Sequence, residues 1–191
     1  MIRIFVLLLT LSFSAFAEDN TTSNFKKYSA FALGVSGEDL VTTTGNDKLT
    51  TAGFLYLSWG VAYDIPDNDI ELVTSVGFNY DSLEVIEGKF SFKETSVEFI
   101  PYYKINNRLR IGLGLFHVVS AEISGPIDPA KFGNSTGTVL QIDWRTGHKG
   151  GWGLRHVDVD LAFDRFNGID VSDSGVTIDG SYTAIISYHR F

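Results

Sequence analysis

The sequence predicts an all-β protein, an eight-stranded antiparallel up-and-down β-barrel that crosses a membrane. Three observations support this prediction. Segments of about ten residues alternate apolar and polar side chains, as the strands of a transmembrane barrel do. Clusters of Gly, Asn, Asp and Pro separate these segments, and these residues favour turns. The separating connections are alternately long and short, which is typical of transmembrane barrels with short turns at one end and longer loops at the other.

The N-terminal segment predicts export. Arg3 precedes an apolar run from Ile4 to Phe13, and the small residues after it end in the A-x-A pattern Ala15-Phe16-Ala17. This order is typical of a secretory signal peptide. The apolar run is about ten residues, whereas a membrane-spanning helix needs about 20. We expect residues 1–17 to be a signal peptide cleaved after Ala17, and 18–191 to form a single outer-membrane barrel domain.

Composition narrows the classes of function. The chain has 23 acidic and 15 basic residues, a net charge of −8, which disfavours nucleic acid as a partner. It contains no Cys, so disulfide bonds cannot stabilise the fold and no lipid can be attached to an N-terminal Cys. Mean hydropathy is +0.08, and after residue 17 no apolar run approaches the length of a membrane helix. These values exclude a helical membrane protein but suit a barrel, whose strands need only every second residue apolar.

The expected strands are justified in chain order by their apolar faces. The first four faces are Phe31, Leu33 and Val35; Leu55, Leu57, Trp59, Val61 and Tyr63; Ile70, Leu72, Val76, Phe78 and Tyr80; and Val97, Phe99, Pro101 and Tyr103. The next three are Leu109, Ile111, Leu113 and Leu115; Leu140, Ile142 and Trp144; and Val157, Val159, Leu161 and Phe163. The eighth strand is 182–191. An even number of strands is the rule for single-chain bacterial outer-membrane barrels.

The connections predict which end of the barrel faces outward. Four long outer loops are expected, at 37–51, 81–91, 120–136 and 164–175, and three short inner turns, at 64–69, 106–108 and 147–151. Opposed residues of an antiparallel pair point to the same side of the sheet. The three-residue turn 106–108 therefore predicts Lys104 opposite Arg110, a like-charge pair that solvent or acidic neighbours must relieve.

Aromatic residues are placed where a bilayer interface favours them. The inner girdle is expected from Tyr63, Tyr103, Trp144 and Phe191, and the outer one from Phe78, Tyr80, Phe90, Phe92 and Phe163. The alternative is a soluble β-sandwich with the aromatic residues in its core, because alternation is common to both architectures. The signal peptide, the aromatic terminus and the unequal connections favour the membrane.

The C-terminal residues Ser187-Tyr188-His189-Arg190-Phe191 resemble the last strand of outer-membrane β-barrel proteins. Such strands end in Phe and are recognised by the barrel-assembly machinery, so the resemblance implies Phe191 as an assembly signal. Here the apolar residues Tyr182, Ala184, Ile186 and Tyr188 have the opposite parity to Phe191. We expect a β-bulge near His189, with an atypical terminal signal as the alternative.

Charged residues on the inward faces form the candidate site. An eight-stranded barrel is filled by its own side chains, so charges inside it must pair. We expect a lumen polar network of Glu71, Glu98, Arg110, Asp143, Arg145, His156, Asp158 and Asp160. The alternative is a narrow conduit or proton path, because ionisable groups at membrane depth are candidates for function.

The segment Leu154-Arg155-His156-Val157-Asp158 resembles the catalytic strand of outer-membrane lipid A deacylases. That pattern has His, one residue, Ser and Asn, which implies His156 as the catalytic candidate. Asp158 and Val159 occupy the serine and asparagine positions here, and a carboxylate is no substitute for the nucleophilic hydroxyl. We therefore expect His156 to hydrogen-bond Gln141, Asp158 or Asp160, and we expect no metal site and no cofactor.

Three functions remain open at this point. The first is a structural or surface-interaction barrel in the bacterial outer membrane that displays four polar loops. The second is a narrow channel or transporter that uses the inward charges. The third is a lipid A-modifying hydrolase or acyltransferase. Expected partners are the bilayer, lipopolysaccharide and the assembly machinery, and a monomer is expected. Architecture does not choose among the three.

Overall fold

The computed structural model describes residues 24–42, 48–53, 55–85, 88–126, 129–147 and 149–191. The expected signal peptide and its cleavage site lie outside these residues. Within them, no helix is long and apolar enough to span a membrane.

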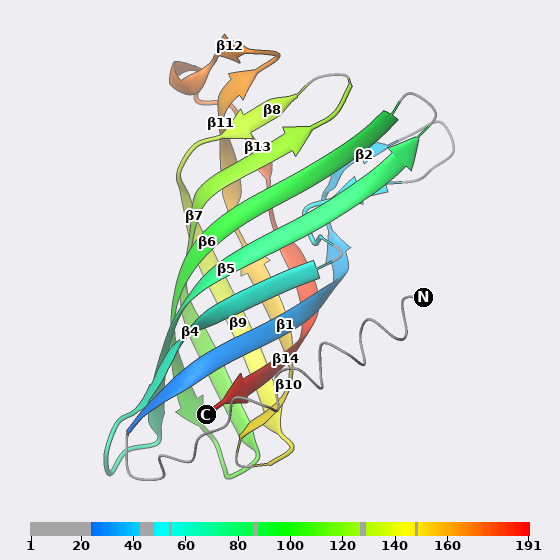
Figure 1. Cartoon of the computed structure of the whole chain (residues 1–191). Helices are drawn as coiled ribbons and strands as arrows, with labels where there is room; N and C mark the ends of the chain where they lie inside the picture. Colours follow the sequence, from blue (N-terminus) through cyan, green and yellow to red (C-terminus); the bar gives the residue numbers. More distant parts are fainter. Residues whose placement is uncertain (1–23, 43–47, 54, 86–87, 127–128, 148) are drawn as a thin grey trace.

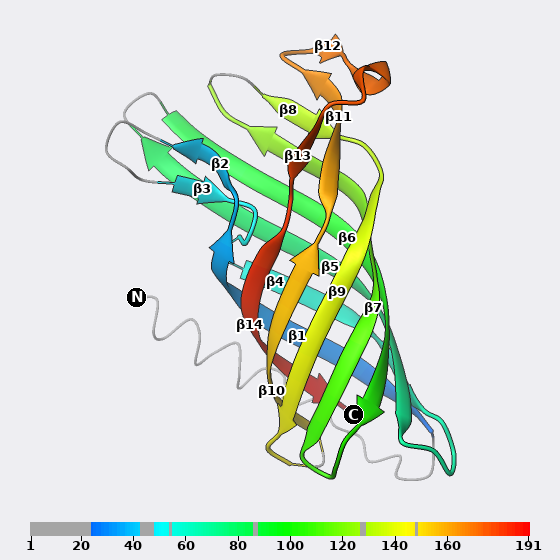
Figure 2. The same ribbon diagram turned by 180° about the vertical axis from the view of Figure 1, so that it is seen from behind.

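Eight long strands form a closed antiparallel barrel (Figures 1 and 2). They are β1 (Phe25–Gly37), β4 (Leu55–Asp64), β5 (Ile70–Val85), β6 (Gly88–Lys104), β7 (Leu109–Ser124), β9 (Ser135–Arg145), β10 (Gly150–Asp158) and β14 (Tyr182–Arg190). Each pairs with the next, and β1 pairs with β14, so the ring closes. The predicted eight-stranded antiparallel barrel is confirmed.

The two ends of the barrel differ. At one end, called the turn end, short connections join β4 to β5, β6 to β7 and β9 to β10, and the C-terminus lies nearby (Figure 1). At the other, called the extended end, β5, β6 and β7 continue well past β4 (Figure 1). The extended end also carries the short elements β2 (Asp39–Thr42), β3 (Lys48–Thr50), β8 (Ala130–Phe132), β11 (Asp160–Phe166), β12 (Ile169–Asp170), the 3-10 helix η2 (Ser172–Ser174) and β13 (Thr177–Asp179).

Much of the expected outer loops is strand. The β5–β6 pairing continues from Asp81 opposite Phe92 to Val85 opposite Gly88, so the expected loop 81–91 is a long hairpin. The expected loop 37–51 contains the β2–β3 hairpin. The reason is that the hairpins bury apolar side chains of their own, among them Phe90, Phe92 and Leu49. Phe90 and Phe92 consequently face inward and do not join an aromatic girdle.

The barrel has an inside-out distribution of polarity. Its exterior carries an apolar belt of large exposed side chains, which includes Trp59, Val61, Val76, Phe78, Val97, Phe99, Tyr103, Ile111, Leu113, Leu115, Leu140, Trp144, Trp152, Leu154 and Ile185. Buried charged residues lie in the interior. A protein folded in water rarely exposes so continuous an apolar surface. The alternative β-sandwich is wrong, since one closed sheet is present and its apolar face points outward.

The seventh barrel strand begins earlier than expected, and its faces are reversed. The barrel-forming strand is Gly150–Asp158, which places Trp152 and Leu154 on the belt. Val157, Val159 and Leu161, expected outside, are buried inside. The register explains this, because Leu154 lies opposite Ile142 on β9, whose exterior face carries even numbers. The period of two then turns every odd-numbered residue of β10 inward.

The last strand contains no bulge near His189. Its pairing with β1 runs without a shift from Arg190 opposite Tyr28 to Ala184 opposite Gly34. The irregularity lies on β1, between Gly34 and Ser36. Tyr182, Ala184, Ile186 and Tyr188 are buried in the interior, so Phe191 shares the exterior parity of His189. The role of Phe191 in assembly stays a prediction.

The predicted pairing at the turn end is confirmed, since Lys104 lies directly opposite Arg110. Acidic neighbours relieve the like charges. The Lys104 ammonium is bound by Asp64, which also binds Lys26 from β1. The Arg110 guanidinium points inward to Glu71 and Asp143. The turn end is therefore tied together by ion pairs that link β1, β4 and β6.

Asp64 predicts an acid-dependent loss of stability. Partial burial acts to raise the pKa of Asp64, but hydrogen bonds from Lys104 and Lys26, with their positive charges, hold that pKa well below its usual range. A lowered folded-state pKa stabilises the protein above about pH 4 and loses this effect as the pH falls further. We expect Asp64→Asn to lower the stability at pH 7 by up to about 1 kcal/mol.

This difference between Asp64→Asn and wild type is expected to shrink as the pH falls below about 4. The measurement is the thermal unfolding midpoint across a pH series. Asp67→Asn in the same turn serves as control, because Asp67 has an exposed side chain and Asn tolerates its positive φ of 55°. A pH-independent difference for Asp64→Asn would contradict the assignment.

Candidate functional site: the charged interior of the barrel

Glu71 is the centre of the first interior cluster, which lies toward the turn end. Arg110 from β7 and Arg190 from β14 both donate to its carboxylate, Arg190 Nη1 at 2.6 Å from Oε2. Arg145 from β9 donates to the same oxygen at 2.8 Å. Glu71 is fully buried, and three cations from three strands surround it. The desolvated carboxylate is therefore strongly compensated, as a buried charge requires.

Arg110 joins this cluster to a second carboxylate. Its Nε donates to Asp143 Oδ2 at 2.8 Å, and Gln141 Nε2 donates to Asp143 Oδ1 at 2.8 Å. The guanidinium also lies near two rings, 4.0 Å from the centroid of Tyr102 and 4.2 Å from that of Tyr188. Charge pairing and cation–π contacts thus both stabilise this one side chain.

The second cluster is a pair, Glu98 on β6 and Arg155 on β10, which face each other across the interior. Arg155 donates through Nη1 at 3.0 Å and Nη2 at 2.5 Å, one bond to each oxygen of Glu98. Tyr56 also donates its hydroxyl to Glu98. The Arg155 guanidinium lies 4.7 Å from the centroid of the Tyr56 ring and 5.5 Å from that of Phe116. This bidentate arrangement fixes the separation of two opposite walls.

An apolar layer closes the interior toward the extended end. Its buried side chains are Leu49, Phe92, Phe116, Val139, Val157, Val159 and Leu161. Glu94 lies at the level of this layer, 1% exposed, and neither carboxylate oxygen has a hydrogen-bond partner among the described residues. The interior therefore combines an ionic half with an apolar half.

The structure places the sequence-predicted site residues in two groups. Glu71, Glu98, Arg110 and Asp143 are buried in the interior, and the half-buried Arg145 joins them. His156, Asp158 and Asp160 are exposed on the exterior, so the expectation that they line the lumen is wrong. The reversed faces of β10 explain the errors at His156 and Asp158, and the same parity continues to Asp160 at the start of β11.

His156 has a different partner from those expected. Its Nδ1 lies 3.0 Å from the hydroxyl of Thr183 on β14, in an exposed position. Asp158 contacts Ser181, whose Oγ lies 3.4 Å from Oδ1. The expected bonds from His156 to Gln141, Asp158 or Asp160 do not form. Within the described residues, no group of three or more His, Cys, Asp or Glu side chains could hold a metal ion.

Sequence reasoning missed Arg155, Arg190 and Glu94. Arg155 lies in β10, whose faces are the reverse of those expected, and Arg190 lies in β14, where the expected bulge near His189 is absent. A usable signal was present, because Trp152 and Leu154 form an apolar face that makes Arg155 inward. For Glu94 the signal was its even number in β6, where the odd-numbered Val97 and Phe99 face outward.

No protein-family model matches the chain, and no curated protein matches it. The chain is an eight-stranded antiparallel barrel with an apolar exterior and an ionic interior. Among solved structures, it is similar to the attachment invasion locus protein Ail of Yersinia pestis in complex with the heparin analogue sucrose octasulfate. That match has 14% identity and a TM-score of 0.48, over 87% of this chain and 97% of that chain.

A second similar structure is Neisserial surface protein A, with 9% identity, a TM-score of 0.47, and coverage of 88% of this chain and 96% of that chain. Ail in a phospholipid bilayer nanodisc matches with 14% identity and a TM-score of 0.42, over 87% of this chain and 99% of that chain.

Proposed function

We propose that the protein is a bacterial outer-membrane barrel of the structural or surface-interaction type, inserted with its extended end outside. The observation that carries the proposal is the inside-out distribution of polarity. Large apolar side chains cover the exterior, while Glu71, Glu98, Arg110 and Arg155 are buried inside. In a closed barrel every strand is paired on both sides, which is what hydrocarbon surroundings demand. The signal peptide expected at residues 1–17 is consistent with this destination.

The limits of the apolar belt support the proposed orientation. At the turn end, Tyr103 and Trp144 are exposed beside the short turns, as interfacial aromatic residues would be. Toward the extended end, the exterior positions of β5 and β6 change from Val76 and Val97 to Ser82 and Lys93. The β5–β6 hairpin beyond this level buries Phe90 and Phe92 and exposes Ser82, Glu84 and Lys89. This surface is where we place contacts with lipopolysaccharide and with partners.

The interior favours a structural role over a conduit. The arginines Arg110 and Arg155 are paired with Glu71, Asp143 and Glu98, and mainly apolar side chains, with Glu94 buried among them, lie between these pairs and the extended end. A pathway for ions would have to break the bidentate pair of Glu98 and Arg155. The surroundings of His156 do not favour the hydrolase alternative, since its Nδ1 lies beside the hydroxyl of Thr183 and Asp158 stands where that mechanism needs a serine.

Insertion predicts that a charge placed in the middle of the belt will be costly. Val76 lies near the middle of the exterior face of β5 and is 53% exposed. We expect Val76→Arg to destabilise the membrane-inserted state by about 2–4 kcal/mol, the cost of a cation at the bilayer midplane. The measurement is the fraction of refolded protein with heat-modifiable mobility on gels after transfer to lipid vesicles.

Ser82→Arg is the matched control, because Ser82 has the same exterior parity on the same strand but lies beyond the belt. It should fold into vesicles as wild type does. If Val76→Arg and Ser82→Arg behave alike, or if the wild-type barrel stays soluble without lipid, the proposed location fails. In a water-soluble protein an arginine at an exposed position would be nearly neutral.

A further inference from the structure

Pro101 occupies a position that a paired barrel strand normally excludes. It lies in the interior of β6, between β5 and β7. The pairing of β6 with β7 goes from Phe99 opposite Leu115 to Tyr102 opposite Gly112, and the two positions between are unpaired. On the other side, the pairing with β5 is unbroken through Leu72 opposite Pro101. The missing N–H of Pro101 therefore faces β7, where Leu113 is its expected partner.

This gap in the ladder, called the β6–β7 seam, lies within the apolar belt. Proline is confined to edge strands, strand starts and bulges in ordinary sheets, and a closed barrel has no edge. A backbone acceptor without a partner is costly in hydrocarbon. Because Pro101 is present in spite of this unpaired acceptor, we infer that the local shape of the barrel wall at the seam has a role.

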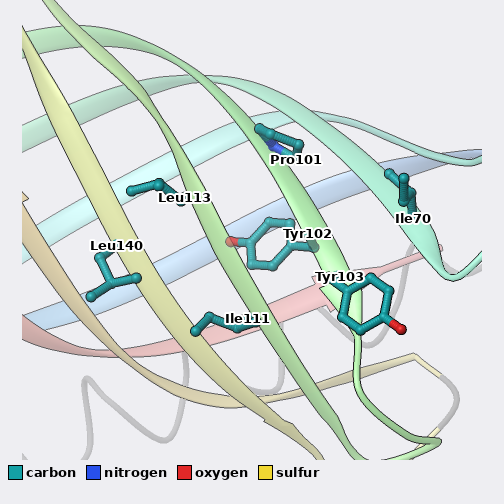
Figure 3. A pocket seen from close by; sticks show the side chains of 7 residues that line it. All are labelled: Ile70, Pro101, Tyr102, Tyr103, Ile111, Leu113 and Leu140. Carbon is teal, nitrogen blue, oxygen red and sulfur yellow. The ribbon is translucent and has the colours of Figure 1, made fainter.

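A groove lies on the exterior over the seam (Figure 3). Its volume is about 380 Å³, and it is lined by Ile70, Pro101, Tyr102, Tyr103, Ile111, Leu113 and Leu140. Tyr102 lies at the floor of the groove, and its ring is buried on the interior side, where it packs over Gly112 of β7. A Cβ at Gly112 would lie 2.6 Å from the Tyr102 ring, so any larger residue would displace that ring.

We propose that this groove binds one acyl chain of a phospholipid from the periplasmic leaflet. The inference rests on the proposed membrane insertion. The lining is apolar along its length, and the exposed Tyr103 lies at its turn end beside Lys104, where the headgroup of that leaflet would lie. Leu113, 63% exposed, stands at the rim, so the groove is recessed between projecting side chains.

The shape of the groove selects the occupant. The walls of two barrels are both convex, so a second copy of this barrel would touch the rims and leave the recess empty. An empty recess gives up dispersion contacts along its whole lining. A flexible hydrocarbon chain can follow the recess and fill it. We therefore expect an acyl chain in the groove to exchange more slowly than the lipid chains elsewhere around the barrel.

The test compares two variants on the same strand. Leu113→Phe fills the groove, whereas Leu115→Phe makes the same change two residues away, at an equally exterior position outside the groove. Each barrel is placed in nanodiscs with phosphatidylethanolamine spin-labelled along its acyl chain, and the motionally restricted lipid component is measured. We expect wild type and Leu115→Phe to show the same slowly exchanging component, and Leu113→Phe to lose it.

Equal spectra for Leu113→Phe and Leu115→Phe, or no slowly exchanging component in wild type, would overturn the acyl-chain site. A dimer of wild type in sedimentation that Leu113→Phe abolishes would also overturn it, by assigning the groove to a second copy. Failure of insertion is seen separately, since such a barrel would not enter the nanodisc or show heat-modifiable mobility. The groove and the proposed location are thus tested by different readouts.

Discussion

Replacing Arg110 by Met is expected to lower the free energy of unfolding by about 3–5 kcal/mol, the cost of breaking a buried ion pair from one side. Met keeps the apolar bulk near the rings of Tyr102 and Tyr188 but removes the charge. Glu71 would keep two arginine partners, but Asp143 would keep only the amide of Gln141. The uncompensated Asp143 carboxylate is the main source of the loss.

The measurement is urea unfolding of the lipid-inserted barrel, followed by gel mobility. Arg108→Met is the matched control, because Arg108 is an exposed residue of the neighbouring turn. We expect its effect to stay within about 0.5 kcal/mol, as for an ordinary surface substitution. Equal effects at the two positions would mean that the interior cluster contributes no more than surface charge.

The pair of Glu98 and Arg155 predicts a strong coupling between two substitutions. Glu98→Leu leaves the Arg155 guanidinium without its carboxylate, and Arg155→Met leaves Glu98 with neutral donors only. Each single change is expected to destabilise the barrel by about 3–5 kcal/mol. The double variant should be less destabilised than the sum of the two, because it leaves no uncompensated charge.

The coupling is obtained from a double-mutant cycle on unfolding free energies in the same vesicles. Arg155→Met combined with Arg110→Met is a control pair, since the two arginines donate to different carboxylates. Its effects should be closer to additive than those of the Glu98 pair. Strict additivity for Glu98→Leu and Arg155→Met would show that the two side chains stabilise the barrel independently of each other.

The sequence predicts best those strands that have one apolar face toward the lipid and one polar face toward the interior. The segment 109–117 alternates Leu and Ile with Arg and Gly, and the structure places Leu113 on the belt and Arg110 inside. The same holds for Leu140 and Asp143 on β9. In these strands polarity alternates along the sequence with the same period of two as side-chain direction, so the sequence shows which residues face outward.

The prediction was wrong where both faces of a strand are apolar. In β10 and its continuation, Trp152 and Leu154 face outward while Val157 and Leu161 face the apolar layer inside. The longer apolar run, from Val157 to Leu161, faces inward although local patterning predicts it outside, and His156 and its neighbours therefore lie on the opposite side from that predicted. The expected outer loops contain hairpins for a related reason. Their apolar residues, such as Leu49 and Phe92, are buried through contacts between distant segments, which the local pattern of the sequence does not show.

What the sequence determined by itself is the barrel: alternating faces, an even number of strands and short turns such as 106–108 are local properties of neighbouring residues. Tertiary structure decided which charges meet. Glu71 and Arg190 lie 119 residues apart, and the bond between them depends on the closure of β1 onto β14. Closure also decided the significance of Pro101, because a missing N–H leaves a seam only where a neighbouring strand has been brought to face it.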